Sequence, residues 1–238
     1  MRFRRAVTVF CLLLVSLALF AAPDSGGSGA KGKSMLLYYF DKGGIFMWAL
    51  LFFSLAGLAI VIERMIVISR VRRGSPEFEA TLRAAALKGD VRKVRQVLEG
   101  DGSDTARILL AGLNSVKKGP ERMERVIEAT ASLQVSIMER GLNFLSSLAN
   151  LAPLVGFLGT VSGMITAFGK ISEAESVSAK LVAGGIFEAL ITTAGGLIVA
   201  IPILIFHNYF VHRVDRFVTD VERLSLELME NLANKGKL

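Results

Sequence analysis

Three long stretches of this sequence carry almost no charge, and they constrain its fold more than any other feature. They cover Ile45–Ile62, Gly141–Gly169 and Leu181–Val211. A soluble protein of this length would place its apolar residues at amphipathic spacing among charged ones. Stretches of this length and composition match the roughly 20 apolar residues that a helix needs to cross a bilayer. We therefore predict an all-α membrane protein with three transmembrane helices.

The formal net charge of +7 makes nucleic acid a candidate partner for this chain. The basic residues, however, lie beside the apolar stretches, where they set the orientation of a membrane helix. The clearest cluster follows the first stretch and consists of Arg64, Arg70, Arg72 and Arg73. No recognisable nucleic-acid-binding motif accompanies these residues. We therefore expect a lipid bilayer around this chain and no nucleic acid partner.

Chemistry at a metal ion or a nucleophile finds little support in the sequence. Cys11 is the single cysteine, so an internal disulfide and a cysteine metal site are excluded. His207 and His212 are the two histidines, and they form no ligand cluster. No nucleophile and base stand together in a recognisable pattern. The sequence predicts no enzymatic activity, no cofactor and no metal site.

Residues 1–22 start with a basic N-terminus and continue as an apolar stretch that is too short to span a bilayer comfortably. This pattern is typical of a secretory signal peptide. The cleavage site is weak, because Leu19 or Phe20 falls where a small residue is preferred. An uncleaved membrane anchor is therefore the alternative. We expect residues 23–44, which include a glycine- and serine-rich linker, to be a periplasmic N-terminal segment.

The arginine cluster also predicts which side of the membrane each segment occupies. Arginines at the end of a span remain in the cytoplasm, so the first helix should run from outside to inside. The connection between the other two stretches is short, so those two helices should be antiparallel. The expected order is a first transmembrane helix at 45–69, a cytoplasmic helical domain at 70–140, a second transmembrane helix at 141–169, a periplasmic loop at 170–180, a third transmembrane helix at 181–211 and a cytoplasmic C-terminal helix at 212–238.

Capping signals divide the charged region into helices. Ser75 precedes a proline and Asp90 follows a glycine, and both are predicted to cap the start of a helix. From Pro120 onward, apolar residues recur at helical spacing with no strong breaker among them. This pattern predicts one long helix over about 120–168. The third apolar stretch is likewise expected to continue as a helix beyond the membrane.

Glu188 is the one acidic residue of the third apolar stretch. It lies eight residues past Lys180, which is about 12 Å along a helix and places it within the hydrocarbon. An ionised carboxylate there costs about 2.5 kcal/mol or more, so such a group faces a bundle interior or water. We predict that Glu188 takes up and releases protons. The alternative is a carboxyl group that reaches to the outer interface.

Small residues and hydroxyl groups are frequent around this glutamate on the second and third stretches. Small residues at positions i and i+4, such as Gly159 and Gly163, let helix backbones approach closely in lipid. Thr192 lies one turn from Glu188 on the same helix face. Close packing is the simpler interpretation, but the hydroxyl groups could also line a proton path, and they belong to Thr160, Thr192 and Thr193.

Two motifs resemble the signatures of the ExbB/TolQ/MotA proton-channel family. The stretch Ala152–Met164, APLVGFLGTVSGM, is similar to the signature of the family's second span. The stretch Gly184–Leu197, GGIFEALITTAGGL, and the following Ala200–Pro202 are similar to the signature of the third span. By this resemblance, the chain is an inner-membrane motor subunit closest to the ExbB and TolQ types.

The resemblance implies a homo-oligomer, expected to be a pentamer, around a central pore lined by the second and third spans. Glu188 is then the essential acidic residue, and Thr160 and Thr193 are pore threonines. The pore would surround an ExbD/TolR-like single-span partner whose aspartate is a second proton carrier, and a TonB/TolA-like protein would transmit force to the outer membrane. The residues expected to pack the helices around the pore are Gly156, Gly159, Gly163, Gly185, Gly196, Pro153 and Pro202.

The function implied by the resemblance is a proton-channel or stator subunit of the inner membrane that drives TonB-dependent outer-membrane transport. Two positions depart from the family pattern: Ser162 stands where ExbB-like sequences often carry tryptophan, and Phe187 replaces a small residue. TolQ-like envelope maintenance and a gliding or flagellar stator are therefore alternatives within the family. A structural membrane scaffold without ion flux is the alternative outside it.

Overall fold

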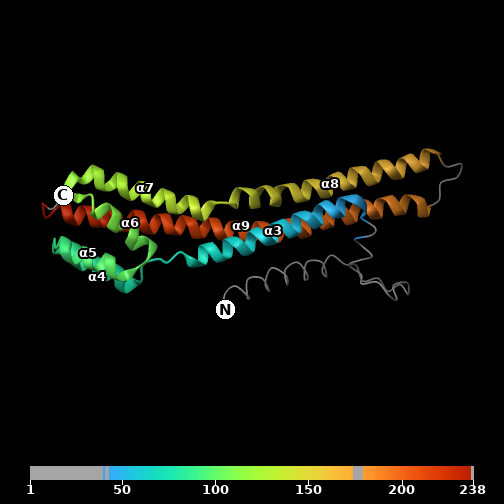
Figure 1. Cartoon of the computed structure of the whole chain (residues 1–238). Helices are drawn as coiled ribbons and strands as arrows, with labels where there is room; N and C mark the ends of the chain where they lie inside the picture. The colour runs from blue at the N-terminus through green and yellow to red at the C-terminus, as the bar shows by residue number, and fades with distance from the viewer. Residues whose placement is uncertain (1–39, 41–42, 174–178, 237–238) are drawn as a thin grey trace. The chain divides into compact units, whose positions relative to one another are not determined.

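The computed structural model of this chain describes residue 40 and residues 43–173 and 179–236. The expected signal peptide 1–22 lies outside the described residues, as does most of the expected segment 23–44. The described residues form helices and turns (Figure 1), and the helices in chain order are α3 (Gly44–Arg70), α4 (Pro76–Leu87), α5 (Val91–Asp101), α6 (Asp104–Leu113), the short 3₁₀ helix η1 (Val116–Lys118), α7 (Pro120–Glu139), α8 (Leu142–Glu173) and α9 (Ala179–Ala233).

Three regions of the described chain are long and apolar enough to cross a membrane, by length and composition. They are α3, the α7–α8 region with its apolar part in α8, and α9. The predicted all-α fold with three apolar helices is therefore confirmed. α8 extends to Glu173, so part of the expected loop 170–180 is helical. α9 continues without a break to Ala233, as expected for a third helix that runs on beyond its apolar part.

The described residues form two compact units. The first contains α3 up to Met65, all of α8, and α9 as far as Asn208. The second contains the end of α3, helices α4 to α7, and the rest of α9 from Tyr209. Because the first two apolar stretches, the third as far as Asn208, and Glu188 fall in the first unit, that unit holds the candidate site.

The prediction of one helix over 120–168 is wrong, because the helix is interrupted between Glu139, the last residue of α7, and Leu142, the first residue of α8. Arg140 has φ −51° and ψ 124°, which is not helical, and Gly141 has φ +82°. A positive φ places a Cβ atom against the backbone, and glycine alone adopts it without this penalty. The apolar spacing continues across the break, so periodicity alone could not reveal it.

The predicted caps of the second unit are confirmed. The Ser75 hydroxyl accepts a hydrogen bond from the Phe78 N–H at 3.1 Å, at the start of α4. The Asp90 carboxylate accepts hydrogen bonds from the N–H groups of Arg92 and Lys93, both at 3.1 Å, at the start of α5. Each cap satisfies N–H groups that have no acceptor within their own helix.

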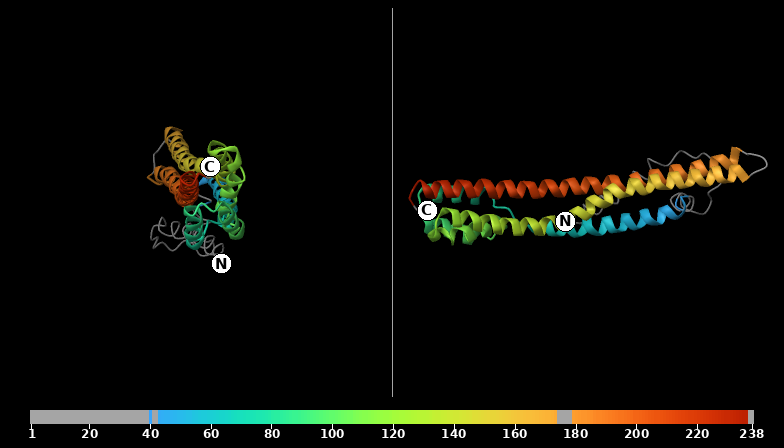
Figure 2. Two further views of the ribbon diagram at one scale, coloured as in Figure 1. Left: turned by 90° about the vertical axis from the view of Figure 1, so that its left-hand side faces the viewer. Right: turned by 90° about the horizontal axis from the view of Figure 1, so that it is seen from above.

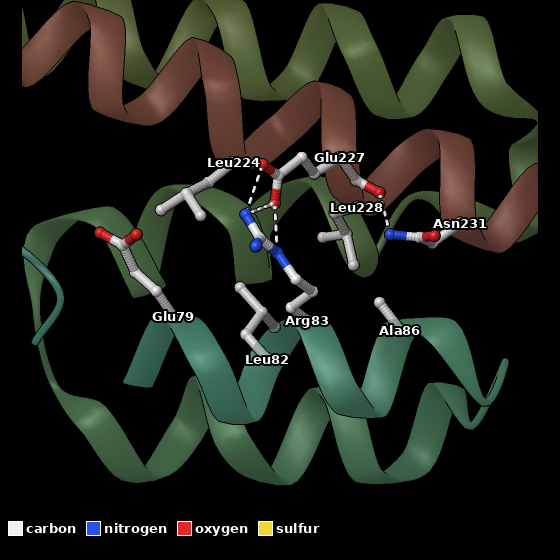
Figure 3. A pocket seen from close by; sticks show the side chains of 8 residues that line it. All are labelled: Glu79, Leu82, Arg83, Ala86, Leu224, Glu227, Leu228 and Asn231. Carbon is white, nitrogen blue, oxygen red and sulfur yellow. Dashed lines mark hydrogen bonds and ion pairs between the residues drawn. The ribbon is translucent and has the colours of Figure 1, made fainter. Parts of the chain in front are cut away.

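α4 packs against the C-terminal part of α9 through a small pocket of apolar and charged residues (Figure 3). Arg83 donates hydrogen bonds to both carboxylate oxygens of Glu227, at 2.7 to 3.0 Å, and Arg223 donates to Glu79 at 2.7 Å. The hydrogen bond from Arg223 to Glu79 is the main cause that raises the pKa of Arg223. Ion pairs this exposed contribute at most about 1 kcal/mol each, so apolar burial holds the two helices together.

Candidate functional site

α8 and α9 lie side by side in the first unit (Figures 1 and 2) and meet through a seam of small residues. On each helix, successive members of this small-residue seam are three or four residues apart, so they occupy one helix face. The order of the contacts runs in opposite directions along the two helices, which are therefore antiparallel. The seam consists of Ala152, Gly156, Gly159, Gly163 and Ala167 from α8 and Gly185, Ala189, Thr192 and Gly196 from α9.

The backbones of the two helices approach closely at the seam glycines. A Cβ atom placed on Gly156 would lie 2.7 Å from the carbonyl oxygen of Thr192, and one placed on Gly196 would lie 2.6 Å from that of Ala152. Both distances are shorter than real Cβ contacts, and a backbone carbonyl cannot rotate away. Glycine is therefore required at these two positions. Such contacts are typical of helix packing in lipid, where small residues bring backbones together.

The pair Gly159 and Gly163, which the sequence singled out, is part of this seam within one chain. A Cβ atom on Gly159 would lie 2.6 Å from the Thr192 side chain. A Cβ atom on Gly163 would lie 3.3 Å from Ala189, a tight contact that leaves slightly more room. The structure therefore places both glycines against α9 of the same chain.

Thr160 and Thr193 lie beside the seam, and their hydroxyl groups are hydrogen-bonded to each other. Thr160 Oγ1 also lies within hydrogen-bond distance of two carbonyl oxygens, those of Ala189 at 3.2 Å and Gly156 at 3.3 Å, and Thr193 Oγ1 lies 3.4 Å from the same Gly156 oxygen, so these oxygens are alternative acceptors for the two hydroxyl hydrogens. The two threonines predicted from sequence are thus brought together across α8 and α9. Together with the nearby carbonyl groups they form a half-buried polar patch between two apolar helices.

Thr192 has a different environment from the other two threonines. Its side chain is 0% exposed and fills the space beside Gly159. Its hydroxyl donates to the carbonyl oxygen of Ala189 at 2.8 Å. Thr192 therefore packs within the seam, and its hydroxyl group is already bound to the backbone of its own helix.

Glu188 is half-buried and faces the start of α3. A Cβ atom placed on Gly44, the first residue of α3, would lie 2.9 Å from Glu188 Oε1. The hydroxyl groups of Thr160 and Thr193 bind each other and backbone carbonyl groups, and the Thr192 hydroxyl donates to the Ala189 carbonyl group, so the carboxyl group and the hydroxyl pair are separate parts of the site.

Two prolines predicted to pack around the site lie inside helices. Pro153 is in α8, and its Cα atom would lie 3.3 Å from a Cβ atom on Gly196 of the seam. Pro202 is in α9 and is buried. A proline inside a helix lacks the N–H that would bind the carbonyl group four residues earlier. Both helices nevertheless continue past their prolines.

α3 contributes to the site in a way that the sequence pattern did not indicate. It packs along α9 in the same direction, because Gly195 of α9 meets Leu50 and Gly57 of α3 meets Ile203. A Cβ atom on Gly195 would lie 3.3 Å from Leu50 Cδ1. Gly43 and Gly44 at the start of α3 were the available signal, since glycine is the usual residue where the backbone adopts a positive φ or approaches another group closely.

Metal ligation finds no support in the described part of the chain. Across residues 43–173 and 179–236, no group of three or more histidine, cysteine, aspartate or glutamate side chains could hold a metal ion. The chemistry of the candidate site therefore rests on one carboxyl group, two paired hydroxyl groups and the backbone around them.

A comparison with protein families identifies the chain. The model of the MotA/TolQ/ExbB proton channel family matches residues 102–223, which include α8, most of α9 and every candidate site residue from Pro153 to Pro202. The chain belongs to this family. As a member, it is a multi-pass membrane proton-channel subunit and not an enzyme.

Individual relatives agree with this assignment. A Synechocystis sp. protein described as ExbB-like 1 is 38% identical over 170 residues, which cover 70% of this chain and 66% of the relative. ExbB of Neisseria meningitidis is 31% identical over 206 residues, covering 81% of this chain and 92% of the relative. TolQ of Haemophilus influenzae is 29% identical over 185 residues, covering 72% of this chain and 80% of the relative. This chain is therefore similar to both ExbB and TolQ proteins.

Proposed function

We propose that this chain couples the proton motive force to mechanical work, with Glu188 as its proton carrier. The observation that supports the proposal is one ionisable side chain, half-buried, in a stretch of α9 that is otherwise uncharged and apolar. Ionisable groups in such a position belong to ion pathways by default, because burying an idle charge in lipid is costly. The Thr160–Thr193 hydroxyl pair would supply polar groups further along the path.

The protein would work as a homo-oligomer, expected to be a pentamer, around the helices of an ExbD/TolR-like partner. The support is the large apolar surface that a single chain leaves uncovered on α8. Some of this surface would face lipid and some would face neighbouring subunits, because both are apolar surroundings. The exposed large apolar residues of α8 are Phe144, Leu151, Leu154, Phe157, Leu158, Val161, Ile165 and Phe168.

The available energy is adequate for this role. One charge that crosses the membrane releases about 2.3 kcal/mol per 100 mV. A TonB/TolA-like protein would carry the resulting movement to the outer membrane, as the similarity to ExbB proteins suggests. TonB-dependent uptake is therefore the preferred role.

The similarity to TolQ supports envelope maintenance as the second candidate. Deletion of the gene separates the two roles. Loss of energy-dependent uptake of outer-membrane substrates, with normal resistance to detergents, supports the ExbB-like role. Sensitivity to detergents with normal uptake supports the TolQ-like role. The channel activity itself is tested by proton flux into membrane vesicles that contain this chain with and without its single-span partner.

We further propose that the N-terminus is periplasmic and the C-terminus cytoplasmic in the bacterial inner membrane. A cysteine at Gly100, which is exposed and has open space around it, should then react with an impermeant maleimide only after the membrane is opened. A cysteine at Glu173, at the exposed end of α8, should react in intact spheroplasts. Both variants are made in a Cys11→Ser background. Labelling of Gly100→Cys in intact spheroplasts would contradict this topology.

The hydroxyl pair gives a separate prediction. Thr160→Val keeps the bulk of the side chain but removes the hydroxyl group that binds Thr193. A hydrogen bond contributes about 0.5–1.5 kcal/mol net, so partner-dependent proton flux should fall by about two- to twelve-fold. Thr160→Ala should have a smaller effect, because it removes both the hydroxyl and the methyl group, and a water molecule can take the place of the hydroxyl in this polar patch. Equal flux in wild type and Thr160→Val would remove this pair from the path.

A further inference from the structure

The start of α3 is shaped to accept the carboxyl group of Glu188. Gly44 has φ +64°, a conformation that residues with a Cβ atom rarely adopt. The missing side chain also leaves room, since a Cβ atom there would lie 2.9 Å from Glu188 Oε1. The backbone conformation thus favours glycine at this position, and an added side chain would displace the Glu188 carboxyl group.

Contacts on either side of Gly44 fix the register of α3 against α9. A Cβ atom on Gly43 would lie 3.3 Å from Ile191 Cγ2, and one on Gly195 would lie 3.3 Å from Met47 Sδ. Positions 188, 191 and 195 follow one another at helical spacing, so they form a single stripe of α9. α3 therefore starts on the stripe that carries Glu188, and the approach of Gly44 to the carboxyl group is part of a continuous contact.

We propose that Gly44 is a positioning residue for the Glu188 carboxyl group, so that the start of α3 borders the proton site together with α8 and α9. This inference rests on the proposed role of Glu188 as the proton carrier. α3 carries no charged side chain between Gly44 and Ile62, so its contribution comes from the backbone. The first N–H groups of a helix have no acceptor within that helix, and this polar edge suits a carboxyl group better than apolar side chains do.

The proposal predicts a specific effect of one added methyl group. In Gly44→Ala, the new Cβ atom displaces the carboxyl group from its position against α3, and partner-dependent proton flux should fall by about tenfold or more, within the range for a misplaced catalytic group. Gly102→Ala is the matched control. Gly102 has nearly the same backbone conformation, φ +61°, and no atom within 4 Å of an added Cβ. The strain of a Cβ atom at positive φ is shared by both variants, but at Gly102 it falls at the end of α5, away from Glu188, so flux should stay within about twofold of wild type.

A chemical probe reports the carboxyl position without relying on flux. Dicyclohexylcarbodiimide labels carboxyl groups in membranes, and the rate of labelling at Glu188 can be followed by mass spectrometry. Displacement from α3 should raise this rate several-fold in Gly44→Ala and leave it unchanged in Gly102→Ala. An equal labelling rate in Gly44→Ala and wild type overturns the positioning role.

A shorter acid provides the rescue test. In the double variant Gly44→Ala, Glu188→Asp, the carboxyl group is one methylene shorter and can avoid the added methyl group. Gly44→Ala should therefore lower the flux by a smaller factor in the Glu188→Asp background than in wild type, and the same comparison applies to assembly if the single variant assembles poorly. An equal factor in the two backgrounds overturns the proposal. If instead Glu188→Gln retains full flux, the proposed function itself fails, whereas loss of flux in Glu188→Gln with normal Gly44→Ala rejects only the role of Gly44.

Discussion

Glu188→Gln is expected to abolish partner-dependent proton flux, with a loss of at least about 100-fold, which is the usual cost of removing a proton-transfer group. Glutamine keeps the size of the side chain and its capacity for hydrogen bonding, but it cannot bind and release a proton. The carboxyl group lies against Gly44, and an amide has nearly the same size and shape, so the substitution changes the capacity to ionise more than the packing. Flux is measured in vesicles under an imposed proton gradient, with assembly checked by oligomer mass in detergent.

Two companion variants separate the proton carrier from a structural carboxyl group. Glu188→Asp keeps an ionisable group one methylene shorter and should retain partial flux. A membrane scaffold without ion flux would tolerate glutamine as well as glutamate, because either can form a hydrogen bond. Normal energy-dependent uptake by cells with an assembled Glu188→Gln protein would therefore reject the proton-carrier role.

Gly156→Ala is expected to produce a large loss of stability, because Gly156 lies against the backbone of α9 in the small-residue seam. The added Cβ atom would lie 2.7 Å from the Thr192 carbonyl oxygen, and only separation of α8 from α9 can relieve that contact. Overpacking of this kind costs about 1–3 kcal/mol. Thermal unfolding in detergent should show a lower Tm than wild type. Gly163→Ala, with its nearest contact at 3.3 Å, should show a smaller decrease.

The control for this series lies on the same helix. Gly169 is in α8, and an added Cβ atom there has no neighbour within 4 Å. Alanine stabilises a helix relative to glycine by about 0.5–1 kcal/mol, so Gly169→Ala should keep or raise the Tm. The two substitutions are chemically identical and differ only in their surroundings. A Gly156→Ala protein as stable as Gly169→Ala would show that the two helices are not packed as described.

Features that depend on local sequence could be predicted. The three apolar helices follow from composition and length, and the helix caps at Ser75 and Asp90 follow from hydrogen bonding within a few residues. The seam glycines were also found, because spacing of small residues on one helix is visible in the sequence. Their partners could not be inferred from spacing alone, since either a second copy or the next helix can supply a small-residue face.

Features that depend on one backbone angle or on distant contacts could not be predicted. Gly141 ends α7 with φ +82°, but the apolar spacing continues on both sides of it and predicts an unbroken helix. Thr192 and Glu188 share a helix face, but the Thr192 side chain packs in the space beside Gly159 on α8, so helix spacing alone did not show that the two side chains have different surroundings. The approach of Gly44 to Glu188 joins residues from different spans, and no local pattern encodes such a contact.

The small-residue seam also limits how this protein can move. If α8 slid along α9, the Thr192 side chain would move from the space beside Gly159 toward Gly156 or Gly163, where the two helices are already in tight contact, so intermediate registers are blocked by steric clash. α8 and the part of α9 that it contacts should therefore move as one rigid body. A conformational change during a proton-transfer cycle would then tilt or rotate both helices together, so that proton binding at one end displaces the other end as well.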